Sequence, residues 1–323
     1  MSICKLKLAR AFPGRLSRIM HGLQRYKYLY LMFIPVLVYY IVFCYAPMIN
    51  PQTGGILMAF KQHHLTKPFS EWEWVGLKYF EMMWRKPDFW IAFRNTITIS
   101  FARLIFEFPV PILLAFILNE VASTKFRRFC QTVFTFPNFL SWVLVIGLLR
   151  DLLQVEGLVN GIITSLGGRP YQFLANSSVF SNYALLILTN LFKNVGWASI
   201  IYLAAIASID PTLYEAAKVD GANRWQCIRY VTWPGIKSTT VVLLILQCGN
   251  ILNGNFDQIF NLVNGVNRDV IEILDVYIYR YAFQQSINQS FAAASGLFKA
   301  VISFSLLIAA NQIARALGEE RLF

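Results

Sequence analysis

Residues 207–237 read ASIDPTLYEAAKVDGANRWQCIRYVTWPGIK and lie between two long apolar runs of the sequence. Asp210 followed by Pro211 is typical of an N-cap and a first helical position, so we expect a short helix at 211–219. Gly221 is expected to end this helix, because glycine readily adopts the left-handed conformation found just after helix ends. The stretch therefore predicts a compact turn of chain between two apolar segments.

A second short helix is expected at about 223–231, and Pro234 is expected to turn the chain back toward the next apolar run. Such runs agree with the composition of the 323 residues, of which 56% are hydrophobic and 14% charged, against about 25% charged in ordinary globular proteins. A soluble enzyme is therefore excluded. The net charge of +12 is interpreted as membrane topology rather than nucleic-acid binding, because a soluble protein cannot keep such runs in water.

The apolar runs predict an all-α integral membrane protein with six transmembrane helices, since about 20 apolar residues cross a bilayer core. Helices are expected because they satisfy their own backbone hydrogen bonds in lipid. The second run is longer than one span needs and contains prolines, so a tilted or kinked helix is expected there. The six expected spans are Tyr28–Met48, Phe89–Leu118, Phe129–Leu149, Tyr183–Ile206, Thr239–Val263 and Ala292–Leu317.

The distribution of Lys and Arg predicts that both termini are cytoplasmic, because cytoplasmic loops carry an excess of cations. The segment before the first span contains Lys and Arg but no acidic residue. The expected organisation is a basic cytoplasmic tail at 1–27, transmembrane helix 1 at 28–48, an extracytoplasmic loop at 49–88, a core transmembrane domain at 89–317 with a cytoplasmic loop at 207–237, and a cytoplasmic tail at 318–323.

Within the loop, Glu215-Ala216-Ala217 is followed after three residues by Gly221 and, nine residues later, by Val231-Thr232-Trp233-Pro234. This spacing resembles the EAA loop of permeases from binding-protein-dependent ABC importers. Val231 and Trp233 stand where the family pattern has Ile and Leu, and both remain apolar.

Shorter matches along nearly the whole chain resemble carbohydrate permeases, and some are similar to a subgroup that imports polysaccharide-derived oligosaccharides such as alginate and pectin fragments. These matches are Tyr45–Pro47, Ala59–Lys61, Trp74–Phe80, Asn95-Thr96, Gly157–Asn160, Lys193–Trp197, Phe256–Ile259 and Tyr277–Arg280.

The resemblance implies a multi-pass protein of the bacterial cytoplasmic (inner) membrane with the type I ABC importer permease fold. It implies a pore shared with a second homologous permease, two ATPase subunits that bind ATP and Mg, and an extracytoplasmic solute-binding protein that delivers an oligosaccharide. No cofactor or metal site is expected in this chain, which is not an enzyme and has no G-x-x-x-x-G-K-[ST] phosphate loop. The ATPase-coupling residues implied are Glu215, Ala216, Ala217, Asp220, Gly221 and Pro234.

Charged and amide side chains inside spans are candidates for a substrate pathway, because burying them in lipid is costly. Lys193 would suit an acidic oligosaccharide, so replacing it with alanine is expected to reduce uptake of a uronate oligomer more than that of a neutral one. The amides fit sugar hydroxyls and equally fit hydrogen bonds between two permease subunits. The pathway candidates are Lys193, Asn194, Trp197, Gln247, Asn250, Asn253 and Asp257.

Other charges in the spans have simpler interpretations. Arg103 and Glu107, four residues apart on one helix face, are expected to neutralise each other. Arg94 and Lys299 lie near predicted span ends and are expected to reach the membrane surface. For the whole chain, the alternative is an ion-coupled secondary transporter of sugars, which would be expected to show internal repeats, and none is visible in the sequence.

Overall fold

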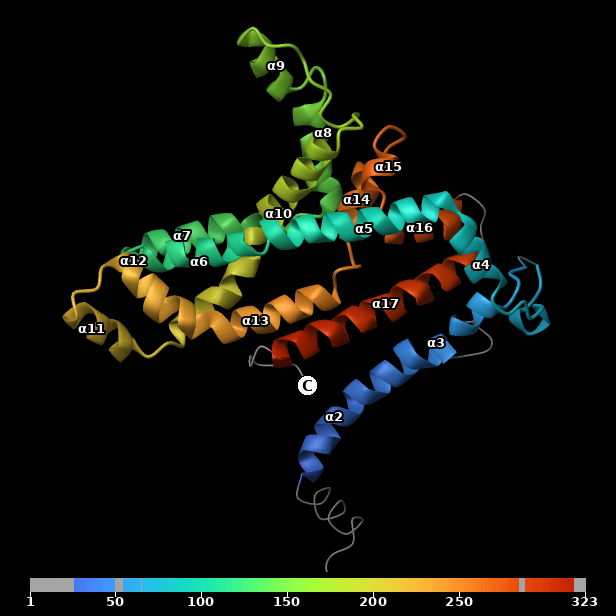
Figure 1. Cartoon of the computed structure of the whole chain (residues 1–323), viewed down its shortest axis with the longest axis horizontal. Helices are drawn as coiled ribbons and strands as arrows, with labels where there is room; N and C mark the ends of the chain where they lie inside the picture. The colour runs from blue at the N-terminus through green and yellow to red at the C-terminus, as the bar shows by residue number, and fades with distance from the viewer. Residues whose placement is uncertain (1–25, 50–54, 65, 285–287, 317–323) are drawn as a thin grey trace, which may run out of the picture. The chain divides into compact units, whose positions relative to one another are not determined.

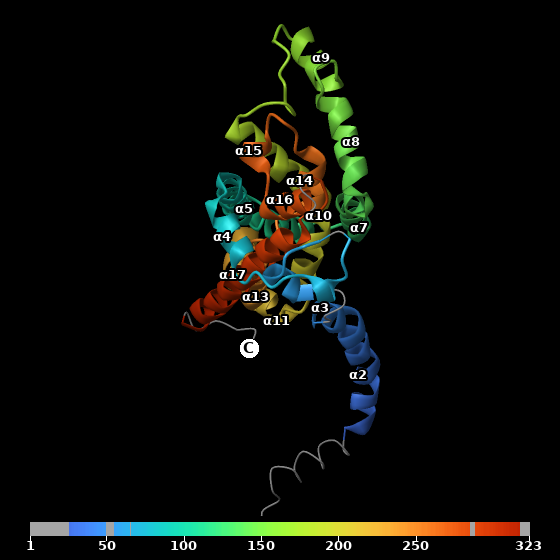
Figure 2. The ribbon, with the colours of Figure 1, turned by 90° about the vertical axis from the view of Figure 1, so that its right-hand side faces the viewer.

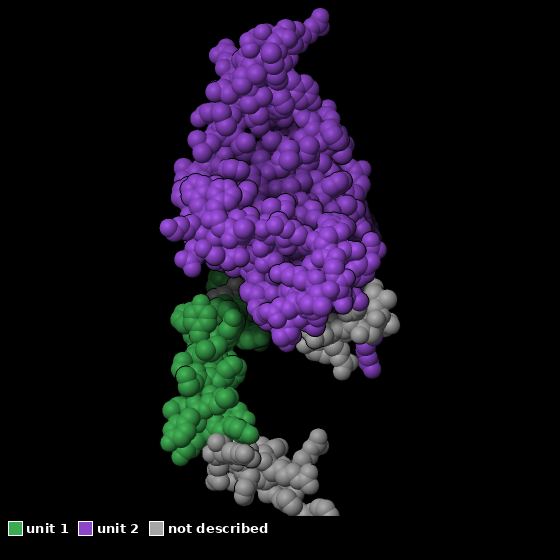
Figure 3. Space-filling view, turned by 90° about the vertical axis from the view of Figure 1, so that its left-hand side faces the viewer, with its two compact units in different colours: residues 1–75 green, residues 76–323 purple. Residues whose placement is uncertain are grey.

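A computed structural model describes residues 26–49, 55–64, 66–284 and 288–316. The tails expected at 1–27 and 318–323 lie almost entirely outside these residues. The described chain is helical, with one isolated antiparallel bridge between Lys61 and Trp74. It divides into two compact units, residues 1–75 and 76–323 (Figure 3).

The first unit contains one long apolar helix and a short folded loop. The helix runs through α2 (Lys27–Tyr40), a π-helical turn η1 (Ile41–Tyr45) and α3 (Ala46–Ile49), and its 23 residues are long and apolar enough to cross a membrane. The loop contains the 3-10 turns η2 (Gly55–Phe60) and η3 (Phe69–Glu71). The first expected span is therefore present as a helix.

Among its described residues, the second unit contains four further helices of membrane-spanning length, at Pro87–Glu120, Val179–Ala207, Arg224–Gly249 and Gln289–Gln312 (Figures 1 and 2). The first of these is preceded by α4 (Lys78–Arg85) and is interrupted between α5 (Pro87–Phe106) and α6 (Pro109–Glu120). The interruption was expected, because a proline removes a backbone donor and opens α6 at its first turn.

The third expected span, 129–149, is not one continuous helix. A first segment, α7 (Thr124–Thr135) with the 3-10 turn η4 (Phe136–Phe139), is bent by 97° from a second, α8 (Trp142–Leu153) with α9 (Leu158–Ser165). The break has local causes: η4 contains Pro137, and the Ser141 side chain caps α8 by accepting from the Leu144 N–H. As a result α9, at the end of this pair, projects from the rest of the unit (Figures 1 and 2).

The fifth span begins and ends earlier in the chain than the expected 239–263. One helix runs from Arg224 to Gly249 through α12 (Arg224–Cys227), the π-helical turn η5 (Ile228–Thr232) and α13 (Trp233–Gly249). Pro234 therefore does not turn the chain back, because the wide turn η5 directly precedes it and the helix continues through it. Residues 250–255 are then non-helical.

The remaining helices complete the second unit. Helix α10 (Val179–Ala207) is followed by α11 (Pro211–Val219), and the non-helical stretch after α13 is followed by α14 (Phe256–Leu262), α15 (Arg268–Ile271), α16 (Leu274–Tyr279), a π-helical turn η6 (Arg280–Gln284) and α17 (Gln289–Ala316). Helix α10 packs on α6, α7 and α13, and α13 packs on α17. One buried apolar cluster between these helices consists of Ile112, Ala115, Tyr202, Ile206 and Ile236.

The contact between α10 and α7 depends on Gly196. A Cβ atom added there would lie 2.1 Å from the backbone oxygen of Phe134, so one of the two helices would have to move. We expect Gly196→Ala to destabilise the protein by about 1 to 3 kcal/mol, as overpacking does, and to lower its melting temperature in detergent. Gly147→Ala in α8 is the control, because a Cβ there meets no atom within 4 Å. Equal melting temperatures for the two variants would contradict this packing.

Candidate functional site

Helix α11 forms as the sequence predicts, and both of its ends are defined by specific hydrogen bonds. The Asp210 carboxylate accepts the Thr212 N–H at 2.9 Å, and this bond lowers the pKa of Asp210. At the other end, Gly221 has φ +79°. Its N–H donates to the Lys218 oxygen at 3.1 Å, while the next N–H donates to the Ala217 oxygen at 2.9 Å. This pair of bonds is a Schellman motif, which ends the helix sharply.

Helix α11 is also connected to the long helix that follows it. The Tyr214 hydroxyl lies 3.0 Å from the Thr232 hydroxyl in η5, and Thr232 is buried. Asn223 opens α12 with a capping box formed with Gln226. Helix α11 is therefore joined by a side-chain contact to the helix at Arg224–Gly249.

The coupling candidates lie on or next to this exposed element. Glu215, Ala216, Asp220, Gly221 and Pro234 are exposed, and Ala217 is half-buried. Large apolar side chains within the same stretch of sequence are also exposed, and exposed apolar side chains can contribute to a partner surface. They are Leu213, Val219, Trp225, Tyr230 and Trp233.

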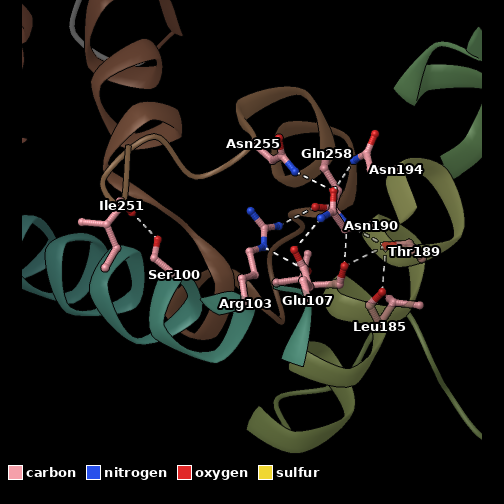
Figure 4. Close-up of polar contacts among 11 residues, drawn as sticks. Ser100, Arg103, Glu107, Leu185, Thr189, Asn190, Asn194, Ile251, Asn255 and Gln258 are labelled. Atoms are coloured by element: carbon pink, nitrogen blue, oxygen red, sulfur yellow. Dashed lines mark hydrogen bonds and ion pairs between the residues drawn. The ribbon is translucent and has the colours of Figure 1, made fainter. Parts of the chain in front are cut away.

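A network of polar side chains connects several helices of the second unit (Figure 4). Arg103 and Glu107 lie 3.6 Å apart between Nε and Oε1, and both are buried, so the expected pairing is confirmed. Arg103 Nη2 also donates to Gln258 Oε1 at 2.5 Å, and Asn190 Nδ2 donates to Glu107 Oε2 at 2.5 Å. The ion pair thus links α5 and α6 to α10 and α14.

The same network holds the non-helical stretch at 250–255. Asn190 Oδ1 accepts from Asn194 Nδ2 at 2.6 Å and from Asn255 Nδ2 at 2.8 Å. Asn255 has φ +53°, a left-handed conformation that asparagine tolerates better than most residues. The Ser100 hydroxyl donates to the Ile251 carbonyl. Irregular backbone within a membrane protein needs such partners, because lipid supplies none.

Three cavities meet at this stretch. One of about 410 Å³ lies between α6, α10 and α13, one of about 210 Å³ adjoins α5, and one of about 560 Å³ lies between α13, α16 and α17. Asn250 lines all three, and Asn253 lines the second and third. Of the predicted pathway residues, the structure brings five to these walls: Asn194, Trp197, Gln247, Asn250 and Asn253.

Two predicted pathway residues are not among those that line the cavities. Lys193 is buried, its Nζ donates to the Asn138 carbonyl at 2.6 Å, and it lies over the Trp142 ring. Asp257 is exposed on α14. The Lys193 ammonium is therefore held by protein groups, against the turn between α7 and α8.

Lys299 forms an ion pair that the sequence did not predict. Its Nζ lies 2.5 Å from Asp275 Oδ1, so it pairs with a neighbouring helix instead of reaching the membrane surface. Both residues line the cavity between α13, α16 and α17. Asp275 is not among the predicted pathway residues, because it lies between the expected spans 239–263 and 292–317. Glu107 and Asn190 also line a cavity, and the four-residue spacing of Asn190 and Asn194 was the signal for a polar face on α10.

Among the described residues, no group of three or more His, Cys, Asp or Glu side chains is placed to hold a metal ion. The described residues thus combine a polar network beside three cavities with an exposed helix, α11.

Comparisons with known proteins agree with this geometry. Residues 107–319 match the model of the family described as binding-protein-dependent transport system inner membrane component. The chain is similar to the polygalacturonan/rhamnogalacturonan transport system permease protein YteP of Bacillus subtilis (strain 168), with 42% identity over 308 residues, covering 95% of this chain and 94% of that protein. It is also similar to the lactose transport system permease protein LacF of Rhizobium radiobacter, with 28% identity over 71% of this chain and 78% of that protein.

Among solved structures, the chain resembles a subunit of a bacterial ABC transporter involved in the import of the acidic polysaccharide alginate. The identity is 36% and the TM-score 0.81, over 93% of this chain and 99% of the other. A second structure of equal TM-score contains that transporter in complex with an alginate pentasaccharide-bound periplasmic protein.

Proposed function

Because the chain belongs to the family of binding-protein-dependent transport system inner membrane components, we propose that it passes an acidic, uronate-type oligosaccharide from a solute-binding protein to the cytoplasm. The chain is a non-catalytic, multi-pass permease subunit of a sugar or oligosaccharide ABC importer in the bacterial inner membrane. Beyond this family role, we propose the charge of the transported sugar, the residues along its pathway and the way in which the permease couples to ATP hydrolysis.

The similarity to two permeases for acidic polysaccharides carries the proposal of an acidic cargo. The polygalacturonan and alginate permeases share 42% and 36% identity with this chain, each over more than nine-tenths of it. The permease named for lactose, an uncharged sugar, is 28% identical over a shorter region. Shared sequence at this level favours a shared substrate class.

The proposed pathway follows the three cavities that share Asn250. Their walls offer amide donors and acceptors from Asn194, Gln247 and Asn253, which suit sugar hydroxyls. Trp197 is half exposed and lines the cavity of about 410 Å³, where it provides an aromatic face. Contacts with a companion permease remain the competing use of the same amides.

We further propose that 207–237 is cytoplasmic, that 49–88 is extracytoplasmic, and that α11 docks on one of two ATPase subunits. The exposed apolar side chains around Glu215 support a docking role. Closure of the ATPase dimer would move α11, and the Tyr214–Thr232 contact would transmit that movement to the helix at Arg224–Gly249. Since this helix ends at Gly249, directly before Asn250, its movement would change all three cavities.

Ligand-stimulated ATP hydrolysis tests the substrate proposal. The complete complex, with companion permease, ATPase and binding protein, is reconstituted in liposomes and supplied with oligogalacturonates or with neutral oligosaccharides of equal length. We expect the acidic oligomers to stimulate hydrolysis more strongly. Stimulation by the neutral series alone would overturn the acidic assignment while leaving the importer role intact.

A further inference from the structure

The cavity between α13, α16 and α17 has an ion pair in its wall. Lys299 Nζ and Asp275 Oδ1 lie 2.5 Å apart, and the two side chains are 14% and 23% exposed. By contrast, the Arg103–Glu107 and Arg280–Glu272 pairs are at most 10% exposed. Of these three pairs, Lys299 and Asp275 are the most accessible, and they line the cavity of about 560 Å³.

We propose that Lys299 binds the carboxylate of a uronate residue in the passing oligosaccharide, and that Asp275 holds and neutralises the ammonium when no acidic sugar is present. This inference rests on the proposed function. A lysine ammonium carries three N–H donors, so a second carboxylate can bond to it beside Asp275. When no substrate is bound, the ion pair leaves this part of the cavity wall neutral overall. An anionic sugar is then attracted only to the exposed part of the Lys299 ammonium.

The other cations near the cavities are already committed to protein groups. Arg103 bonds to Gln258 and pairs with Glu107, and Lys193 donates to a backbone carbonyl. Removing either from its partners would leave a buried polar group unsatisfied, which is costly. Lys299 can bond to a second carboxylate while it keeps its bond to Asp275, so neither group loses a partner.

Two further features of the same wall suit a sugar. The Ser303 hydroxyl is buried without a hydrogen-bond partner, and the amides of Asn250 and Asn253 line the same space. Gly296, one helical turn before Lys299, would place a Cβ in open space, with no atom within 4 Å. A sugar ring can therefore approach α17 closely at this position.

Because Lys299 and Asp275 carry opposite charges, replacing them is expected to change uptake of an acidic oligomer in opposite directions. Lys299→Gln leaves the Asp275 carboxylate facing the substrate, so uptake of oligogalacturonate should fall about tenfold or more, the size expected for losing a charged hydrogen bond. Asp275→Asn removes the competing carboxylate, so the KM for oligogalacturonate should decrease. Uptake of the same oligomer with its carboxyls methyl-esterified should stay near the wild-type rate in both variants, and Lys299→Arg should retain the preference for the acidic form.

The measurement is the initial uptake rate by the complete complex in liposomes, over a range of concentrations of ligand-loaded binding protein and normalised to the amount of permease. Equal losses for both oligomers in Lys299→Gln and Asp275→Asn would mean that the pair is only structural and would overturn the proposal. A selective loss of acidic uptake in Lys193→Gln, with none in Lys299→Gln, would overturn it as well. A wild-type complex that imports neither oligomer with ATP would refute the proposed function itself.

The cavity is tested separately at Gly296. Gly296→Trp should fill the space and block both oligomers, and Gly296→Ala, whose smaller side chain meets no protein atom within 4 Å, should reduce uptake less than Gly296→Trp does. Unchanged uptake in Gly296→Trp would place this cavity outside the pathway and contradict the inference.

Discussion

Replacing Glu215 with alanine is expected to uncouple the transporter while leaving the permease folded in the membrane. Glu215 is exposed on α11, whose ends are fixed by Asp210 and Gly221, so the substitution should not change the helix. If Glu215 meets a basic residue of the ATPase, truncating one partner of this charge pair should weaken association about 100-fold. Co-purification with the ATPase and ligand-stimulated ATP hydrolysis would both measure the loss.

The matched control for this experiment is Glu156→Ala. Glu156 is also an exposed glutamate, but it lies between α8 and α9, away from α11 in the sequence and in the fold (Figure 1). Wild-type ATPase association in the Glu215 variant, or an equal loss in both variants, would contradict the docking role of α11.

Replacing Glu107 alone with leucine is expected to be among the most destabilising single changes in the chain. Arg103 would remain buried without its counter-charge, which typically costs about 3 to 5 kcal/mol. Asn190 would also lose the acceptor of its Nδ2 bond, and that residue holds Asn255 in the non-helical stretch. Thermal unfolding in detergent and the yield of membrane-inserted protein would both report the loss.

The double variant Arg103→Met with Glu107→Leu separates the ion pair from its neighbours. Removing both charges leaves no unpaired ion, so the double variant should be more stable than Glu107→Leu alone. Additive losses, or a single variant as stable as the wild type, would mean that the two charges do not depend on each other.

The apolar runs predicted most of the architecture because a bilayer imposes a length on every span. The kink after α5 and the boundaries of α11 were also predictable, since proline, Asp210 and Gly221 act locally. The position of the fifth span was not. Hydropathy predicts that a span begins where the apolar run begins. The helix of the fifth span begins earlier, at Arg224, among polar residues.

The broken third span and the cavities depend on contacts between distant segments. Pro137 and Ser141 mark the break in the sequence, but the 97° bend is a property of the packed structure. Likewise, Asn190, Asn250 and Asn255 could be recognised as polar residues in or near spans. That Asn250 lines three cavities and that Lys299 meets Asp275 required the fold.

The most direct test of the central claim is uptake of labelled oligogalacturonate into liposomes that contain the complete complex. We predict that uptake requires ATP on the side of the ATPase and ligand-loaded binding protein on the opposite side, and that collapsing the proton and sodium gradients does not reduce it. Uptake that follows an ion gradient without ATP or binding protein would contradict the claim.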